Sequence, residues 1–421
     1  MADTDDRVFA TYRLESPGDP EAAATALAGE QSSGTFVPVP GETPALKARF
    51  AARVEAVEPL DPADRPSLPG GAGTEGPCHR ARVRISWPVG NFPEDIPALW
   101  AAVLGNLFEM RQVTGLKLEA LDLPAFLTDR YRGPRFGASG TRHLAGVPDN
   151  RPLIGTIIKP SVGLTPEATA DLVQTLAEAG LDFVKDDELM VSTANAAFRQ
   201  RVEHVMAVVN READRTGRQI MVAFNLSGTL EVMKRRYETI VEAGGTCAML
   251  NLNAVGWSGV HEVCRWGQLA VHGHRNGWGM LTRHPWLGMD FSAYQAFWRL
   301  AGVDHLHVNG LANKFWEPDA SVVRSIRACS TPLGNLGPLL PVVSSGQWGG
   351  QAFDTWRQTG TTDLLYLAGG GIHAHPDGPG AGVQAIRQAW QAAVDGLDPN
   401  AAADRYPAFR RSRETFGNPA S

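Results

Sequence analysis

A lysine and three carboxylates follow a short apolar run in the stretch from Gly180 to Glu188, GLDFVKDDE. The run from Leu181 to Val184 is typical of a buried parallel strand, and ligands bind at the carboxyl ends of such strands. The charged residues at that end are Lys185, Asp186, Asp187 and Glu188. They suit either a hard-cation site built from oxygen ligands or a lysine with a shifted pKa. A solvated loop or helix start is the plain structural alternative.

Seven further apolar runs between residues 153 and 367 also end in polar side chains or glycines. The i, i+2 spacing in two of them, HGHR and HLH, points both imidazoles of each pair the same way. A lone histidine or a glycine run is common in cores and turns, but the repetition at every strand end favours one functional cluster. Its members are Lys159, Asn225, Asn251, Asn253, His272, His274, Arg275, His305, His307, Asn309, Lys314, Ser344, Ser345, Gly346 and the glycines 369–371.

The rhythm of strand, turn and helix repeats eight times after residue 151, which predicts an α/β fold with a C-terminal (β/α)8 barrel. An open doubly wound sheet is the rival, but no GxGxxG follows the first run. We assign the barrel and a C-terminal helical tail to residues 146–421. The predicted strands are 153–158, 181–184, 220–224, 247–252, 269–272, 305–308, 340–343 and 364–367.

Residues 1–145 have the pattern of a separate α+β, ferredoxin-like domain. Strands are predicted at Val8–Tyr12 and Ala81–Trp87, and helices at Pro20–Gly29 and Pro97–Leu107. Residues 60–76 are rich in proline, glycine and alanine and are expected to form a loop. Glu30 follows the first helix and is a candidate buried carboxylate.

The composition excludes several classes of protein. A net charge of −6 without a Lys/Arg cluster argues against nucleic-acid binding. The four cysteines have no CxxC spacing, which disfavours thiolate metal sites and disulfides and suits a reducing cytoplasm. The acidic start lacks a signal-peptide core, and no apolar run approaches the roughly 18 residues of a membrane helix. We therefore expect a cytoplasmic protein.

Carboxylates, lysines, an arginine, histidines and glycine-rich anion cradles together suit a phosphorylated sugar. Its carbonyl and adjacent hydroxyl would chelate Mg²⁺, and the metal would stabilise an enediolate formed by proton abstraction beside the carbonyl.

These motifs resemble the large subunit of ribulose-bisphosphate carboxylase/oxygenase, and more closely its non-carboxylating relatives, the RuBisCO-like proteins of form IV. GTIIKP is similar to the motif of the catalytic lysine, which places it at Lys159. DFVKDDE is similar to the activation motif, which implies that Lys185 takes up CO₂ as a carbamate and binds Mg²⁺ with Asp187 and Glu188. Only a neutral amine attacks CO₂, and a carbamate adds an oxygen ligand for a hard cation.

The resemblance implies further roles along nearly the whole chain. His274 is an active-site residue and Lys314 a lysine of the sixth, mobile loop. The implied binding residues for substrate and phosphate in the barrel are Arg275, His307, Ser344, Gly346, Gly369 and Gly370. GEQSSGTF and GNLF are similar to motifs that contribute Glu30, Thr35 and Asn106 to the barrel of a partner subunit. An antiparallel homodimer with two shared active sites is implied.

Four positions depart from the carboxylase pattern. Ser161 replaces a second lysine, Ile157 stands at a threonine position, Trp278 at a histidine position and Ser345 at a glycine. Loss of the second lysine removes a base partner suited to ribulose bisphosphate. Bulk at Trp278 and Ser345 suggests a substrate with one phosphate and a different far end, and we expect no CO₂ fixation.

The expected function is Mg²⁺-dependent enolate chemistry on a monophosphorylated keto-sugar or keto-acid. Lys159 would act as the acid/base, and the carbamate on Lys185 or His274 is the alternative base. Within the family the motifs favour 3-oxo-isoapionate-4-phosphate transcarboxylase/hydrolase. The alternatives are isomerisation of 5-methylthioribulose 1-phosphate, enolisation of 2,3-diketo-5-methylthiopentyl 1-phosphate, and a non-catalytic sugar-phosphate-binding regulator.

Overall fold

The computed structural model describes residues 6–34, 39–71, 76–92, 95–148, 151–193 and 197–417. The chain forms two compact units. The first, here called the N-terminal unit, comprises the described residues of Met1–Gly133, Gly277–Ala301 and Pro332–Leu336. The second, here called the barrel unit, comprises those of Pro134–Asn276, Gly302–Thr331 and Gly337–Ser421. The predicted division of the chain between residues 145 and 146 stays a prediction.

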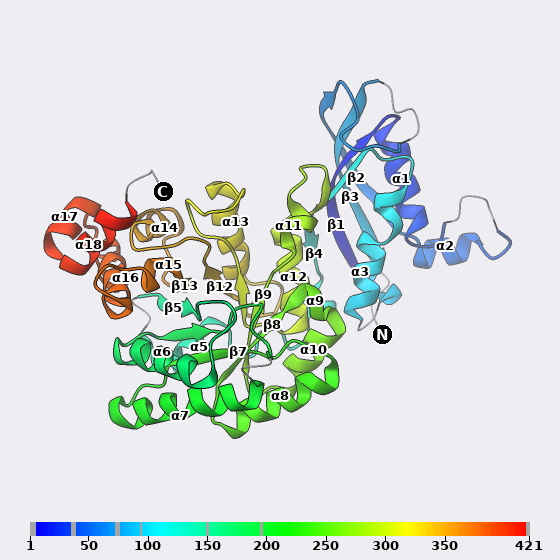
Figure 1. The fold of residues 1–421 in the computed structure, drawn as a ribbon. Helices are drawn as coiled ribbons and strands as arrows, with labels where there is room; N and C mark the ends of the chain where they lie inside the picture. Colours follow the sequence, from blue (N-terminus) through cyan, green and yellow to red (C-terminus); the bar gives the residue numbers. More distant parts are fainter. Residues whose placement is uncertain are drawn as a thin grey trace. The chain divides into compact units, whose positions relative to one another are not determined.

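The N-terminal unit is built on a five-stranded sheet in the order β10-β4-β1-β3-β2, of which Figure 1 labels β1 to β4. All neighbours are antiparallel except β10 and β4, which are parallel. The order β4-β1-β3-β2 is that of the predicted ferredoxin-like domain. Alternate side chains of β1 are fully buried, as a half-buried antiparallel strand requires. The strands are β1 (Arg7–Ser16), β2 (Arg53–Ala63), β3 (Cys78–Pro88), β4 (Gly115–Asp122) and β10 (Leu287–Met289).

The loop predicted for residues 60–76 is wrong at its start, because β2 continues to Ala63. Leu60 and Ala63 pair with residues of β3. Pro62 lies in the stretch predicted as a loop, but an edge strand tolerates proline because one side of its backbone has no partner strand.

The helices of the N-terminal unit are short. Asp19 caps the first, with its carboxylate accepting hydrogen bonds from the backbone N–H groups of Glu21 and Ala22. The helices are α1 (Pro20–Glu30), α2 (Pro44–Phe50), η1 (Val89–Asn91), α3 (Ile96–Leu104), η2 (Asn106–Glu109), α4 (Ala125–Thr128), α11 (Trp278–Thr282) and α12 (Phe291–Ala301).

The barrel unit is a closed parallel barrel of eight strands, as predicted from the eightfold repeat. β9 and β11 pair directly, which closes the barrel although β10 lies between them in sequence. The strands are β5 (Leu153–Ile157), β6 (Phe183–Lys185), β7 (Met221–Asn225), β8 (Cys247–Asn251), β9 (Ala270–His274), β11 (His305–His307), β12 (Leu340–Val343) and β13 (Leu365–Leu367).

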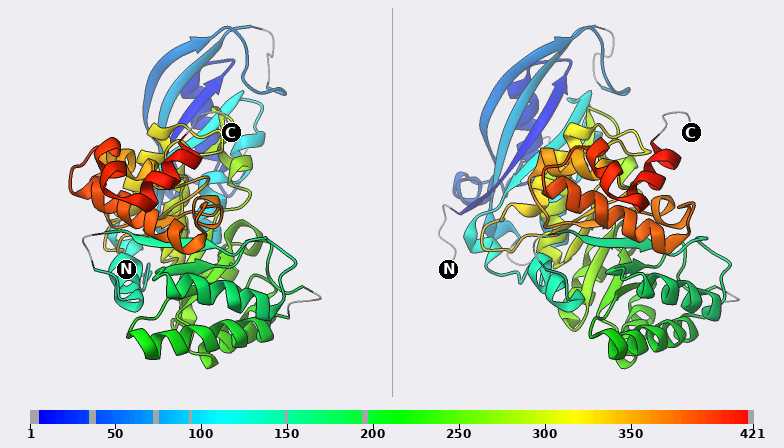
Figure 2. Two further views of the ribbon diagram at one scale, coloured as in Figure 1. Left: turned by 60° about the vertical axis from the view of Figure 1, so that its left-hand side comes forward. Right: turned by 90° about the vertical axis from the view of Figure 1, so that its left-hand side faces the viewer.

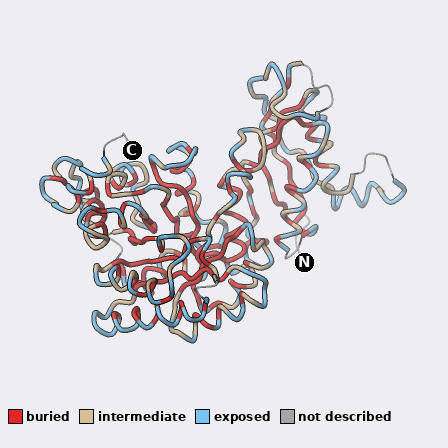
Figure 3. The backbone as a smooth tube through the Cα atoms, in the orientation of Figure 1, coloured by how far each residue is buried: buried red, intermediate tan, exposed pale blue. Residues whose placement is uncertain are grey.

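Helices surround the strands, buried on one side and exposed on the other (Figure 3). The tail helices α17 (Pro399–Arg405) and α18 (Pro407–Phe416) pack on α16 (Pro379–Val394), as both views of Figure 2 show. Among the described residues no helix has the length and apolar character to cross a membrane. The other helices are α5 (Gly137–Ala145), α6 (Pro166–Glu178), α7 (Phe198–Thr216), α8 (Leu230–Glu242), α9 (Leu252–Val255), α10 (Trp257–Trp266), α13 (Asp319–Ser330), α14 (Gln351–Thr359) and α15 (Gly370–His373).

The barrel interior is apolar in the layers nearest the amino-terminal ends of its strands. Alternate residues of the strands form one buried cluster that includes Phe183, Met249 and Leu367, and α5 contributes Ala145 to it. The same i, i+2 alternation continues to the carboxyl ends, where the interior positions become polar. The apolar layers therefore fix the strands that carry the candidate site.

Candidate active site

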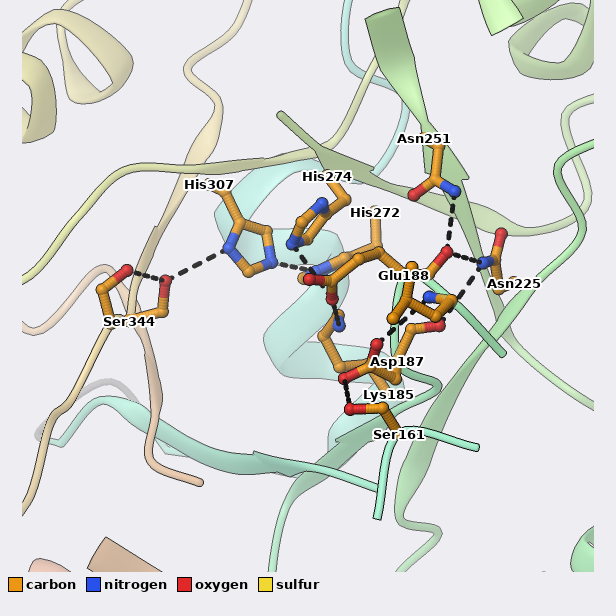
Figure 4. A network of polar contacts seen from close by, with 12 residues as sticks. Ser161, Lys185, Asp187, Glu188, Asn225, Asn251, His272, His274, His307 and Ser344 are labelled. Atoms are coloured by element: carbon orange, nitrogen blue, oxygen red, sulfur yellow. Dashed lines mark hydrogen bonds and ion pairs between the residues drawn. The ribbon is translucent and has the colours of Figure 1, made fainter. Parts of the chain in front are cut away.

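Lys185 ends strand β6 inside the barrel and is almost completely buried, with 1% of its surface exposed. Burial lowers its pKa from 10.5 to about 8, although the nearby carboxylates of Glu188, Asp187 and Asp186 act in the opposite direction. At pH 7 about a tenth of this amine is therefore uncharged, far more than for a lysine with the ordinary pKa. The amine Nζ lies 3.8 Å from Oε2 of Glu188 (Figure 4).

Asp187 receives hydrogen bonds on both carboxylate oxygens. Nζ of Lys159, at the end of β5, donates to Oδ2 at 2.6 Å, and the Ser161 hydroxyl donates to the same atom at 3.0 Å. The backbone N–H of Leu189 donates to Oδ1 at 3.1 Å. Burial alone would raise the pKa of Asp187, but these hydrogen bonds and the charge of Lys159 lower it. Asp187 is therefore an ionised carboxylate.

Glu188 is positioned through its main chain as well as its side chain. Its carbonyl accepts hydrogen bonds from the side-chain amides of Asn225 at 3.1 Å and Asn251 at 2.9 Å. Its Oε2 lies 3.5 Å from Nε2 of His274. The sequence placed both asparagines at strand ends but gave no indication that they hold the turn after β6.

Asp186 points away from this group of residues. Its Oδ2 accepts hydrogen bonds of 2.8 Å from Arg201 of α7 and from the backbone N–H of Asn225. The Arg201 and Asp186 side chains are 0% and 2% exposed. Asp186 therefore anchors β6 to α7 and β7. Arg201 was missed by the sequence analysis because its position inside a helix resembles that of any helical arginine.

His274 lies near Lys185, with 15% of its side chain exposed. Burial and then the charge of Lys185 lower the pKa of His274 to about 3, so this imidazole is neutral at physiological pH. A pKa of about 3 makes this imidazole a weak base at physiological pH, so the predicted role of an alternative base stays a prediction.

Arg275 does not face open solvent. Its Nη2 lies 3.2 Å from Oε2 of Glu317, a carboxylate that also accepts a hydrogen bond of 2.6 Å from Asn309. Both Arg275 and Glu317 are buried. The sequence predicted the arginine at this strand end but not the carboxylate opposite it, which lies 42 residues away.

The loops after β12, β11 and β13 form the candidate anion cradle. Ser345 and Gly346 have positive φ angles of 77° and 85°, and the Lys314 N–H donates to the Ser345 carbonyl at 3.2 Å. The Lys314 side chain is exposed. Around Gly370 no atom lies within 4 Å of where a Cβ would stand, and around Gly369 only Ile157 comes as near as 3.8 Å. These two glycines leave room for a ligand to approach the backbone.

A metal ion fits the donors in this region only if Lys185 becomes an oxygen ligand. Among the residues that the structure describes, no three His, Cys, Asp or Glu side chains are grouped to hold a metal by themselves. Asp187 and Glu188 supply two carboxylates beside a buried amine with a lowered pKa. A carbamate on this amine would complete a set of hard oxygen donors.

The predicted partner-reaching residues lie in the N-terminal unit. Glu30 is the last residue of α1 and is exposed in the chain, so its predicted burial is wrong for the single subunit. Asn106 begins η2 and is also exposed. The side-chain amide of Gln31, directly after α1, links α1 to η2. Its oxygen accepts a hydrogen bond of 2.8 Å from the backbone N–H of Asn106. Thr35 lies outside the described residues.

A closed (β/α)8 barrel with lysines, carboxylates and histidines at its strand ends is the architecture of a barrel enzyme. The chain belongs to the ribulose bisphosphate carboxylase large-chain family. The family model for the catalytic domain matches residues 146–416, and the model for the N-terminal domain matches residues 1–127. The predicted family is thereby confirmed.

Relatives within the family are similar over nearly the full chain. A 3-oxo-isoapionate-4-phosphate transcarboxylase/hydrolase from Xanthobacter autotrophicus is 52% identical over 96% of this chain and 98% of its own. A 3-oxo-isoapionate-4-phosphate decarboxylase from Rhizobium rhizogenes is 47% identical over 91% and 92%. The crystal structure of a rubisco-like protein from Burkholderia fungorum is 46% identical, with a TM-score of 0.92 over 98% of this chain and 100% of that one.

Proposed function

We propose that the protein is an Mg²⁺-dependent enzyme of enolate chemistry that acts on 3-oxo-isoapionate 4-phosphate as a transcarboxylase/hydrolase. The observation that carries this proposal is the buried Lys185, with a pKa of about 8, between the carboxylates Asp187 and Glu188. The similarity to the relatives that act on this compound supports the choice of substrate.

Lys185 as its CO₂ carbamate, Asp187 and Glu188 would hold Mg²⁺. When bound, the metal would supply Lewis-acid stabilisation of negative charge on a substrate oxygen. The lowered pKa of Lys185 favours carbamate formation because the neutral amine is the reactive form. Asn225 and Asn251 would keep Glu188 in place through its carbonyl.

Lys159 and His274 are the proton-handling residues of the proposal. Nζ of Lys159 reaches the site beside Asp187. As the ammonium it would donate to the substrate carbonyl oxygen, and as the neutral amine it would take a proton next to that carbonyl. His274 is the alternative acceptor because its Nε2 lies 3.5 Å from Oε2 of Glu188, in the same group of residues. Lys314, exposed on the loop after β11, would close over the bound substrate.

The substrate phosphate would bind at the ends of β9 and β11–β13. Two glycines there have open space above the backbone, and the turn at Gly346 has the left-handed geometry that exposes N–H groups. One phosphate is proposed because Trp278 and Ser345 are bulkier than the histidine and glycine of the carboxylases. Where the carboxylases have a second lysine, the Ser161 hydroxyl bridges Lys159 and Asp187. The residues assigned to the substrate and its phosphate are Arg275, His307, Ser344, Gly346, Gly369 and Gly370.

Two reactions occur among the similar relatives, namely carboxyl transfer with hydrolysis and decarboxylation. A substrate labelled with ¹³C at its carboxyl carbon separates them. We expect the label to remain in a non-volatile acid when the purified protein turns over 3-oxo-isoapionate 4-phosphate. Release of the label as ¹³CO₂ would assign decarboxylation, and absence of any turnover would overturn the proposed substrate.

We also propose a homodimer in which Glu30, Thr35 and Asn106 complete the partner's site. Mixing the Glu30→Gln and Lys185→Ala proteins tests this, since a mixed dimer would contain one intact site. If each variant alone is inactive, random exchange should restore about a quarter of the wild-type activity per subunit. A mixture as inactive as its components, with exchange verified by mass, would contradict shared sites.

A further inference from the structure

Three histidines in contact with one another form a column inside the barrel. The column links α5 to Ser344, in the candidate phosphate region. Oγ1 of Thr141 in α5 lies 2.7 Å from Nε2 of His305. Nδ1 of His305 lies 3.3 Å from Nδ1 of His272, and Nε2 of His272 lies 2.8 Å from Nε2 of His307. Nδ1 of His307 then lies 3.2 Å from Oγ of Ser344, as Figure 4 shows. We call this set the histidine column.

The three imidazoles are buried and uncharged. His272 and His305 are 0% exposed, and His307 is 6% exposed. Burial lowers the pKa of His305 to about 3, and burial with neighbouring positive charge lowers the pKa values of His272 and His307 well below 6.5. A neutral imidazole has one N–H donor and one acceptor nitrogen. Each contact in the column therefore contains one proton. Once the donor and acceptor of one contact are known, the donor and acceptor of every other contact follow.

Thr141 decides that orientation. Its hydroxyl donates to the carbonyl of Gly137 at 2.5 Å, one turn earlier in α5. The oxygen can then only accept from His305, which must carry its proton on Nε2. Nδ1 of His305 is left as an acceptor, so His272 carries its proton on Nδ1 and His307 on Nε2. Nδ1 of His307 is thereby an acceptor for the Ser344 hydroxyl.

The opposite orientation has weaker contacts at both ends. Thr141 would have to abandon the Gly137 carbonyl. The Ser344 hydroxyl would have to donate to the carbonyl of Val308 at 3.3 Å or to Oγ of Ser345 at 3.5 Å. Both distances are longer than the 3.2 Å between Oγ of Ser344 and Nδ1 of His307, the contact that the favoured orientation uses. The observed contacts therefore favour the orientation in which every hydrogen bond of the column is donated in the direction from Ser344 toward Thr141.

We propose that Thr141 is a positioning residue that sets the tautomers of the histidine column and makes the Ser344 oxygen an acceptor toward the ligand. The column does not conduct protons, because Thr141 is fully buried and its own proton is held by a backbone carbonyl. Its effect is to present lone pairs of Ser344, while backbone N–H groups of the glycine loops meet the phosphate charge. This consequence rests on the proposed assignment of Ser344 to the substrate phosphate.

The tautomers can be read directly from the wild-type protein. Selective ¹⁵N labelling of histidine, with assignment by single substitutions, distinguishes Nδ1–H from Nε2–H rings by their ¹⁵N shifts. We expect Nε2–H for His305, Nδ1–H for His272 and Nε2–H for His307 at pH 8. Any other set in the wild-type protein overturns the proposal without the need for a variant.

Substitution of Thr141 tests the cause. Thr141→Val keeps the shape but removes the acceptor, so His305 should move its proton to Nδ1 and the column should reverse. Thr141→Ser retains the hydroxyl and should keep the wild-type tautomers. Unchanged tautomers in a folded Thr141→Val protein would overturn the role of Thr141.

Binding of inorganic phosphate at pH 8 gives a second readout. In Thr141→Val the Ser344 proton becomes free to donate, so phosphate should bind about three- to tenfold more tightly, the value of one hydrogen bond. Thr141→Ser should match the wild type. The increase should vanish in the Ser344→Ala background. If the tautomers reverse but phosphate binding does not change, the column is supported and the assignment of Ser344 to the phosphate fails.

Discussion

Lys159 donates a hydrogen bond of 2.6 Å to Oδ2 of Asp187, across the gap between the ends of β5 and β6. The proposed catalytic lysine and a proposed metal ligand are therefore in direct contact. An ammonium here competes with a metal ion for the same oxygen.

This contact predicts opposite effects of Lys159→Met on binding and on catalysis. Removing the positive charge frees Asp187, and Mg²⁺ should bind about three- to tenfold more tightly because less repulsion opposes it. Turnover should fall by about a hundredfold or more through loss of the acid/base. Lys314→Met, on the exposed loop, is the matched control for metal affinity. Calorimetric titration that found weaker Mg²⁺ binding in Lys159→Met would contradict this reading.

Asn251 should influence the metal without touching it. Its amide donates to the Glu188 carbonyl at 2.9 Å, so Asn251→Ala should loosen the turn that carries Glu188. Loss of such a supporting hydrogen bond typically lowers metal affinity by about 10- to 100-fold. Asn253 lies two residues further along the chain. Asn253→Ala removes an exposed hydrogen bond to the Asn276 carbonyl and should leave the affinity for Mg²⁺ unchanged. Equal Mg²⁺ dissociation constants in the two variants would argue against a role for the clamp on Glu188.

Two arginines of α7 should differ sharply in their contribution to stability. Arg201 pairs with Asp186 in the interior, and Arg201→Ala would leave a buried carboxylate unpaired at a cost of about 3–5 kcal/mol. Arg199 pairs with Glu203 and Glu242 on the surface, and Arg199→Ala should change the free energy of unfolding by less than about 1 kcal/mol. Urea unfolding measures both. Similar losses in the two variants would show that Asp186 is not held as described.

The buried histidines predict a loss of stability in acid. Burial lowers the pKa values of His272, His274, His305 and His307, so below about pH 6.5 the unfolded chain binds protons that the folded chain does not. The free energy of unfolding should therefore fall as pH drops from 6.5 toward 3, by up to about 1.4 kcal/mol per pH unit for each histidine. Asp304, whose pKa is raised to about 6 by burial, opposes this trend below pH 6.

The contribution of a single histidine to this pH dependence of the free energy of unfolding can be measured with a variant. His305→Gln should show a slope shallower by about 1.4 kcal/mol per pH unit between pH 6 and pH 4, whatever its overall stability. Denaturant titrations at several pH values give the slopes. Parallel slopes for the two proteins would mean that His305 is not held neutral in the fold.

The sequence was sufficient to predict the barrel because the spacing of apolar residues along the chain indicates each strand and helix locally. The i, i+2 spacing of His272 with His274, and of His305 with His307, predicted that the two imidazoles of each pair point the same way. It could not show that His272 contacts His305 and His307, because closure of the barrel decides which strands are neighbours. For the same reason the sequence did not reveal Arg201 opposite Asp186 or Glu317 opposite Arg275.

The strand β10 was missed for a related reason. Leu287–Met289 lies between two barrel strands in sequence, yet it pairs with β4 of the N-terminal unit. Three residues carry too little periodicity to indicate a partner, and the pairing depends on a segment about 170 residues away along the chain.

The central claim is that Lys185 becomes a metal ligand through reaction with CO₂. The most direct measurement is turnover of 3-oxo-isoapionate 4-phosphate after preincubation with or without CO₂ and Mg²⁺, in the wild type and in Lys185→Ala. We predict that the wild type needs both, and that its rate of activation rises with pH around 8 as the Lys185 amine loses its proton. Lys185→Ala should remain inactive under all conditions. Full wild-type turnover without CO₂ and Mg²⁺, or substantial turnover by Lys185→Ala, would contradict the account.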